Sequence, residues 1–203
     1  MPLQPQLERI VGELADAGRR AHEVAEPLAA DAWGARPTAG EWSVAECLIH
    51  LTLTSRAFLP LIRETIRSGR DRGLVSGGPY RRDIVGRLLH WLTNPPVRLR
   101  IKTTAPFVPA AVEPKGRVLA ELDSLQEQRT SCVRDADGLD LGRLRIVSPF
   151  SRRVRYNLYS CLTIIAAHQR QHLAQAGAVI RGLRAADASR PGSASRPSSP
   201  PSS

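Results

Sequence analysis

Residues 156–183 read YNLYSCLTIIAAHQRQHLAQAGAVIRGL, and this stretch decides the fold of the chain. It contains no proline, and its first glycine is Gly177. One set of residues recurs at alternating steps of four and three, which predicts the inward face of a helix packed in a bundle. That set is Cys161, Ile165, His168, His172, Gln175 and Val179. Two histidines therefore stand where a bundle helix usually carries leucine or isoleucine.

His168 and His172 lie one helical turn apart, so their Cβ atoms are expected about 5–6 Å apart on one face. A buried imidazole needs a hydrogen-bond partner or a metal ion. Two imidazoles that point to one spot favour a metal, which binds neutral ring nitrogens at about 2.0–2.1 Å. A histidine pair at this spacing also occurs in helices for structural reasons or in contact with solvent. The pair alone leaves both readings open.

The residues between the two histidines exclude one enzyme class. They are Gln169, Arg170 and Gln171, so the motif is not H-E-x-x-H. The glutamate that serves as the general base of zinc peptidases is missing, and we do not expect a peptidase. Whether a metal site exists then depends on a third ligand.

His50 is the candidate for that third ligand. It lies within the broad apolar face of a helix predicted over residues 43–67, and its ring should point inward. Alone, such a histidine is more often a core residue with a hydrogen-bond partner. Together with His168 and His172 it forms a three-imidazole set that leaves at least one metal position open.

The start of this helix carries a second signal. Ser43 and Glu46 have the spacing of a capping box, with Trp42 placed to pack on Cys47 as a hydrophobic staple. Glu46 also precedes His50 by one turn and could orient its ring. The capping role requires only local geometry, so we favour it.

The remaining periodic segments predict an all-α protein. Further helices are expected over about residues 3–26, 84–92 and 114–136. The proline-rich connection over residues 70–113 is long enough to cross over the bundle, so the helices on either side of it can run parallel. Residues 139–155 are expected to form a basic connector. These features favour a four-helix bundle with a long crossover between its second and third helices.

Length and composition fit one soluble domain. The chain has 203 residues, of which 42% are hydrophobic. No apolar run reaches the roughly 18 residues of a membrane span, and no signal peptide is visible. Three widely separated cysteines, Cys47, Cys132 and Cys161, indicate reduced core thiols and a cytoplasmic location. We expect the domain to span residues 1–184 and residues 185–203, rich in proline and serine, to form a disordered tail.

The net charge of +10 comes almost entirely from arginine, with clusters over residues 81–102 and 143–155. Such a surface attracts nucleic acid, anionic lipid or acidic small molecules, or it is a solvated basic face. Aromatic residues make up only 4% of the chain, too few for extensive base stacking, so we favour the solvated basic face and keep a nucleic-acid binder as the weaker alternative. Because no apolar run is long enough to span a membrane, we expect no membrane partner. His22 and His90 are interpreted as surface or structural histidines.

Three motifs carry a resemblance to a known family. They are RPTAGEWSVAECLIHL at 36–51, VEPKG at 112–116 and IIAAHQRQHLAQ at 164–175. Together they resemble the DinB superfamily, in its DinB-like or YfiT-like branch of metalloenzymes, over about residues 3–183. The family signature is W-S followed by a histidine, and later H-x-x-x-H. It matches His50, His168 and His172, with no ligand lost.

The resemblance implies a four-helix bundle in down-up-up-down order and a divalent metal, namely nickel, zinc, manganese or iron. Characterised relatives include S-transferases that use bacillithiol or mycothiol, and mycothiol-dependent isomerases. It therefore implies a metal-dependent enzyme acting on a small-molecule thiol and an electrophile. Apolar bundle faces often pair, which makes a homodimer a separate expectation. Arginines of 81–102 or 143–155 could hold carboxylates of the thiol. A metal-binding stress-response module without turnover is the alternative, and no catalytic residue is identified.

Overall fold

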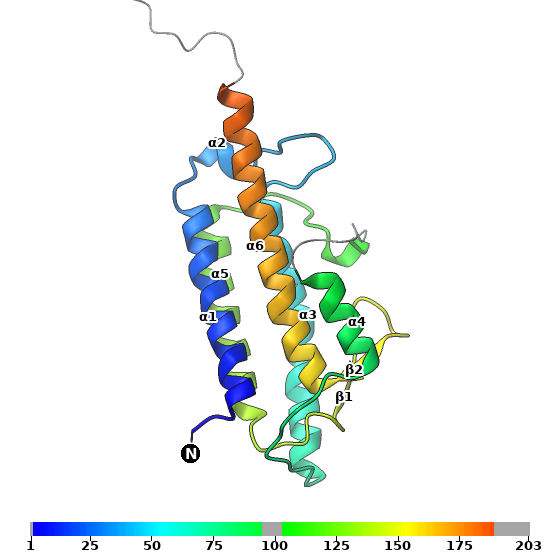
Figure 1. Cartoon of the computed structure of the whole chain (residues 1–203). Coiled ribbons are helices and arrows are strands. Elements are labelled where there is room, and N and C mark those ends of the chain that lie inside the picture. Colours follow the sequence, from blue (N-terminus) through cyan, green and yellow to red (C-terminus); the bar gives the residue numbers. More distant parts are fainter. Residues whose placement is uncertain (1, 95–102, 189–203) are drawn as a thin grey trace, which may run out of the picture.

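The computed structural model describes residues 2–94 and 103–188 of the chain. In these ranges the longest elements are α1 (Pro5–Ala25), α3 (Val44–Asp71), α5 (Lys115–Asp135) and α6 (Leu158–Ala188). Helix α1 packs against α5 and α6, and α3 packs against the same two helices. Figure 1 shows the four lying side by side. The prediction of a mostly helical protein is confirmed.

Two apolar clusters fill the space between these helices. The first centres on Leu7, Leu14 and Ile62 and extends to Ile165 of α6. The second includes Ala21 of α1, Leu48 of α3 and Leu173 of α6. Small alanines on the last turns of α1 let the helices approach closely, whereas leucine and isoleucine fill the first cluster. In α6, His168 falls between Ile165 and Leu173, where one cluster gives way to the other.

Local capping sets the starts of α3 and α5. The Ser43 side chain accepts a hydrogen bond from the backbone of Glu46, and the Glu46 carboxylate accepts one from the Ser43 backbone, which confirms the predicted capping box. Pro114 is the N-cap of α5. Lys115 donates to the carbonyls of Glu26 at 3.1 Å and Leu28 at 2.7 Å. This lysine therefore ties the start of α5 to the end of α1.

The connection between α3 and α5 contains α4 (Ile84–Thr93) and the 3₁₀ helix η1 (Ala105–Phe107). The helix predicted over residues 84–92 is confirmed, and it packs on α6 beside the strands (Figure 1). One short helix, α2 (Ala30–Trp33), lies in a predicted loop. Trp33 is buried there, and its indole donates a hydrogen bond to the Glu113 carbonyl at 2.8 Å. This one aromatic side chain anchors α2, which is too short to give a periodic pattern in the sequence.

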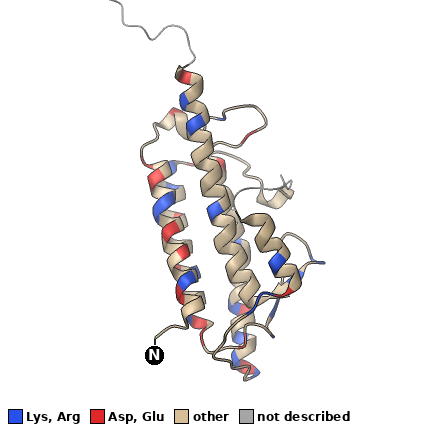
Figure 2. Cartoon of the chain, viewed as in Figure 1, with Lys and Arg blue, Asp and Glu red and all other residues tan. Residues whose placement is uncertain are grey.

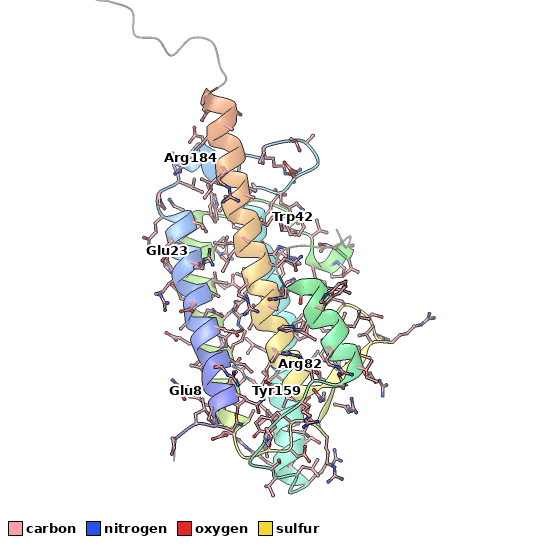
Figure 3. The ribbon with its side chains drawn as sticks, viewed as in Figure 1. Glu8, Glu23, Trp42, Arg82, Tyr159 and Arg184 are labelled. Carbon is pink, nitrogen blue, oxygen red and sulfur yellow. The ribbon has the colours of Figure 1, made fainter. Side chains whose placement is uncertain are left out.

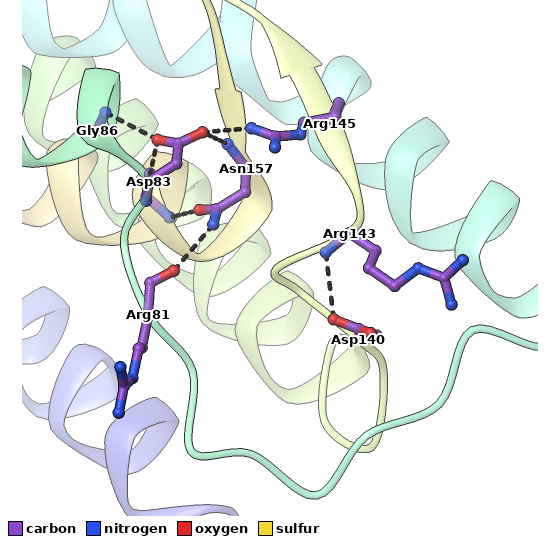
Figure 4. Close-up of polar contacts among 8 residues, drawn as sticks. Arg81, Asp83, Gly86, Asp140, Arg143, Arg145 and Asn157 are labelled. Atoms are coloured by element: carbon purple, nitrogen blue, oxygen red, sulfur yellow. Dashed lines mark hydrogen bonds and ion pairs between the residues drawn. The ribbon is translucent and has the colours of Figure 1, made fainter.

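Asp83 fixes α4 against α6 and the strands (Figure 4). One carboxylate oxygen accepts from the Gly86 backbone at 2.8 Å and from the Ser160 hydroxyl at 3.1 Å. The other accepts from the Asn157 backbone at 2.9 Å and from Arg145. Asp83 is therefore both the N-cap of α4 and the polar link between three elements.

The structure corrects several predicted boundaries. The connector over residues 139–155 contains β1 (Arg145–Val147), which pairs antiparallel with β2 (Arg155–Asn157). Helix α3 does not end at Gly69 but continues to Asp71. Gly69 is buried, and a Cβ there would meet a Leu144 methyl at 2.8 Å, so this glycine serves close packing and not helix termination.

Helix α6 also runs beyond the expected domain boundary at residue 184. It continues to Ala188, because Ala185, Ala186 and Ala188 are strong helix formers. The predicted tail is therefore helical over residues 185–188. The remainder of that predicted tail, residues 189–203, lies outside the described residues.

Helix α3 is the one described helix long and apolar enough to cross a membrane by length and composition. Its candidate window is 72% buried inside the protein, as expected for the core helix of a soluble protein. The three cysteines are free and buried in the described structure. This finding agrees with the prediction that the three cysteines are reduced core thiols.

The contact between α4 and α6 generates a test of the packing. A Cβ at Gly86 would lie 2.0 Å from the hydroxyl oxygen of Ser160 and 2.2 Å from its Cβ, too close for either to remain in place. Gly86→Ala should therefore destabilise the protein by about 1–3 kcal/mol through overpacking. Gly12→Ala in α1 is the matched control, because a Cβ there meets nothing within 4 Å. It should instead stabilise the protein, by up to about 1 kcal/mol. Chemical denaturation measures the free energy of unfolding of both variants. Equal stabilisation by the two substitutions would contradict the close contact of Gly86 with Ser160.

Candidate metal centre

Three histidines from two helices meet in the middle of the bundle. His50 comes from α3, and His168 and His172 come from successive turns of α6. One ligand nitrogen from each ring lies within 4.8 Å of the other two. The Nε2 atoms of His50 and His168 are 3.2 Å apart. Two nitrogens bound at about 2.05 Å to one tetrahedral ion lie roughly 3.3 Å apart, so this spacing matches a shared ion.

Hydrogen bonds fix which nitrogen is available in two of the three rings, those of His50 and His172. The Nδ1 atom of His50 donates to the carbonyl of Phe107 at 2.7 Å. The Nδ1 atom of His172 donates to the amide oxygen of Gln175 at 3.0 Å. Each ring, when neutral, then carries its lone pair on Nε2, the nitrogen that faces the cluster. Such partners commonly set the tautomer and orientation of metal-binding histidines.

Burial keeps the three rings neutral. The pKa of His50 lies below the usual 6.5, mainly because burial disfavours the charged ring. The pKa of His168 is well below that value, through burial first and then through the neighbouring His172, His50 and Arg129. Burial, with a smaller effect of His50, lowers the pKa of His172 to about 3. Neutral imidazole is the form that binds a metal, so the site is prepared for one near pH 7.

Aromatic side chains surround the three rings. Trp42 is stacked on His172 with ring centroids 5.8 Å apart, and it contacts His50 at 5.1 Å. Phe150 lies 6.2 Å from His168 and 4.4 Å from Phe107. Figure 3 shows Trp42 beside the upper half of α6. These side chains place apolar surface around the three rings and reduce the contact of the rings with water.

A buried arginine helps to set the position of α6. Arg129 of α5 is only 3% exposed, and burial lowers its pKa to about 9. With the Gln169 amide oxygen facing it, both terminal guanidinium nitrogens donate to that oxygen, at 2.7 and 2.8 Å. Gln169 is the neighbour of His168, so this contact fixes the rotation and register of α6 where the two ligand candidates lie.

The start of α3 places His50. The Glu46 carboxylate accepts hydrogen bonds from Ser43 and from Arg36. Burial alone would raise the pKa of Glu46, but the bonds from Arg36 and Ser43 outweigh it and the pKa is lowered. The alternative role of Glu46, as the partner of His50, is not what the structure shows, because His50 Nδ1 bonds to the Phe107 carbonyl.

The other two histidines lie outside the cluster. His22 bridges Glu26 at 2.9 Å and Asp123 of α5 at 3.0 Å, which raises its pKa, first through Glu26. His90 is half-buried on α4, and its pKa is lowered by burial and by nearby arginines. Both agree with the interpretation as surface or structural residues.

Sequence reasoning did not find three contributors to the site. The Phe107 carbonyl has no residue-type signature, because any residue offers a backbone oxygen. Phe150 lies in a segment without helical periodicity. Arg36 precedes the capping box, and only its place in the motif at 36–51 marked it. Within the described residues, the cluster contains no carboxylate or thiol ligand.

Comparison with known proteins gives one match. The model of the DinB superfamily matches residues 13–176. No curated protein and no solved structure matches the chain. The matched range includes all three histidines and the long helices of the fold, α1 and α6 in part.

The geometry predicts the effect of removing one histidine. Purified without a metal-binding tag, the protein should contain about one divalent ion per chain. His168→Ala should abolish this stoichiometric metal, because it removes the nitrogen that faces His50. His90→Ala is the matched control and should retain the metal. Elemental analysis measures the content of each, and full retention by His168→Ala would contradict the site.

Metal removal should lower stability in a pH-dependent manner. Metal that binds only the folded chain adds RT ln(1 + [L]/Kd), about 2.7 kcal/mol when free metal is a hundred times Kd. Protons compete for the nitrogens, so the difference between loaded and chelated protein should shrink as pH falls below 6.5.

The metal-free protein should also lose stability over this range. The folded pKa values of the three rings lie below the unfolded value of 6.5. The rings therefore contribute fully to the free energy of unfolding above pH 6.5. This contribution is lost as the pH falls toward the folded pKa values, about 3 for His172. Thermal melts with and without chelator test this, with His168→Ala as the control that chelator should not affect. An unchanged melting temperature for metal-loaded protein on chelation would contradict the coupling.

Proposed function

Because the chain belongs to the DinB superfamily, we propose that it is a metal-dependent enzyme that uses a low-molecular-weight thiol, of the S-transferase or isomerase type. One observation carries the proposal: three neutral imidazole nitrogens from α3 and α6 converge within 4.8 Å of one another. The Nδ1 hydrogens of His50 and His172 are held by partners outside the cluster, so the lone pairs of these two rings face inward.

The donor set narrows the choice of metal. Imidazole nitrogen suits zinc, nickel and iron, whereas manganese prefers oxygen ligands. A cluster of three imidazoles without a carboxylate therefore favours the first three over manganese. Three protein ligands leave at least one coordination position for a substrate.

The protein residues supply binding, orientation and exclusion of water. His50, His168 and His172 would hold the ion, and Trp42 and Phe150 would cover their rings. A bound divalent ion would lower the pKa of a coordinated thiol and present it as a thiolate. Glu46, the nearest acid along α3, is already engaged by Ser43 and Arg36. A reaction whose nucleophile arrives with a second substrate fits a site of this composition.

The proposal assumes a four-helix bundle in down-up-up-down order. The ribbon directions support it: α1 and α6 rise from the end marked N in Figure 1, and α3 and α5 descend toward it. The contacts of α1 and α3 with both α5 and α6 support it as well. Buried free cysteines support a reducing, cytoplasmic location.

A metal-binding module without turnover is the second candidate. The observation that favours it is the absence of an acid, base or thiol from the cluster within the described residues. Such a protein would respond to metal or stress through binding alone.

Turnover separates the two candidates. Metal-loaded protein is mixed with bacillithiol or mycothiol and an epoxide or chlorinated electrophile, and loss of free thiol and isomerisation of the electrophile are followed. The S-transferase form of the proposal predicts thiol consumption faster than the uncatalysed reaction, with a carbon–sulfur bond in the product. The isomerase form regenerates its thiol, so it predicts faster isomerisation of the electrophile in the presence of thiol without net thiol loss. Both forms predict that His168→Ala abolishes the rate and that His90→Ala retains it. Full metal occupancy with neither thiol consumption nor isomerisation above background for any pair would favour the binding module.

A further inference from the structure

An open groove lies between α4 and the strand pair. It has a volume of about 410 Å³, within the range of small-molecule sites. Seven residues line it: Arg82, Asp83, Ile84, Val85, Arg87, Arg145 and Arg155. They come from the segment before α4, from α4 itself and from both strands. The groove is therefore built by elements that Asp83 holds together, and its shape is fixed by the fold.

The charge of the groove is strongly positive and largely uncompensated. Four arginines face one aspartate. Asp83 is already engaged by Arg145, Gly86, Ser160 and Asn157. Arg82, Arg87 and Arg155 have no carboxylate partner among the residues that the structure describes. Figure 2 shows basic residues on α4 and the neighbouring strands.

This groove is separate from the three histidines. A Cβ at Gly86 would touch Ser160, so the first turns of α4 lie at the level of Ser160 on α6. His168 is eight residues farther along α6, or about 12 Å at 1.5 Å per residue. Figure 3 likewise shows Arg82 toward the lower end of α6 and Trp42, which contacts the histidines, toward the upper end. These arginines therefore do not belong to the metal centre.

The arrangement of the arginines indicates the class of ligand. One planar carboxylate is satisfied by a single guanidinium fork. Arginines on three different elements instead suit a group with several oxygens on different sides, which is the geometry of a phosphate. Ile84 and Val85, which are 76% and 39% exposed, add an aliphatic rim beside the charges. We propose that this groove binds the phosphate group of a phosphate monoester, with the organic part of the ester against Ile84 and Val85.

Two sources of this group are tested in parallel. Glycerol 3-phosphate is titrated into the full chain and backbone amide shifts are followed by NMR. Sedimentation with phosphatidylcholine vesicles, with and without phosphatidic acid, tests the same group at a lipid surface. Arg87→Gln/Arg155→Gln removes two exposed groove arginines that no carboxylate engages in the described structure, so the variant should fold. Arg152→Gln/Arg153→Gln is the matched control, because it removes equal charge from the nearby turn outside the groove.

The proposal predicts amide shifts at residues 82–88, 145 and 155, or sedimentation that requires phosphatidic acid. It predicts an affinity for the probe at least about tenfold weaker in the groove variant, since two charge-assisted hydrogen bonds are lost. The control variant should retain wild-type affinity within about twofold. Binding of glycerol 3-phosphate identifies a soluble ester, and binding of vesicles alone identifies the lipid. Equal loss in both variants, shifts spread over the basic surface, or binding of neither probe would overturn the proposal.

Discussion

The contact of α3 with α6 at the level of His50 and His168 is the constraint on which the site depends. Two Nε2 atoms at 3.2 Å are close enough for a hydrogen bond or for a shared ion, and the His50 side chain is buried while that of His168 is half-buried. The surrounding structure holds this pair in place. The Phe107 carbonyl fixes the His50 ring, and the Arg129–Gln169 contact fixes α6 against α5. An apolar bundle thus contains one polar layer in which hydrogen bonds orient the rings of His50 and His172.

The fold and the three histidines could be predicted because their signals are periodic. His168 and His172 occupy a seam that repeats every three or four residues, and His50 follows a capping box that fixes where its helix begins. The structure brings these three side chains together, and metal binding itself stays a prediction. Gly69 shows the limit of such reasoning: a glycine near a helix end resembles a terminator, but here it makes room for Leu144.

The features that the sequence did not predict lie in segments without a periodic pattern. The strands β1 and β2 have three residues each, too short for an alternating pattern to be distinguished from a loop. The Nδ1 atom of His50 donates to a backbone carbonyl more than fifty residues away in the sequence. A backbone carbonyl is present in every residue, so no residue type predicts this partner. The arginines of 81–102 and 143–155 were visible as clusters, but only the fold places Arg87 and Arg155 in one groove, away from the histidines.

The described molecule therefore separates two environments. Around the histidines, burial keeps the imidazoles neutral, and the available nitrogens of His50 and His172 face the cluster. At the start of α4, arginines surround an open groove and attract negative charge. The first environment suits a soft or borderline divalent ion, and the second suits an anionic group in water. One bundle accommodates both because Asp83 and Ser160 hold α4 against a different turn of α6 from the one that carries the ligands.

X-ray absorption at the zinc edge, on protein loaded with one equivalent of zinc, tests the central claim most directly. The account predicts about three nitrogen ligands at about 2.0–2.1 Å with the multiple-scattering pattern of imidazole, plus a light-atom ligand at the open position. Sulfur in the coordination shell, or an imidazole contribution of one ring or none, would contradict the convergence of His50, His168 and His172 on a single ion.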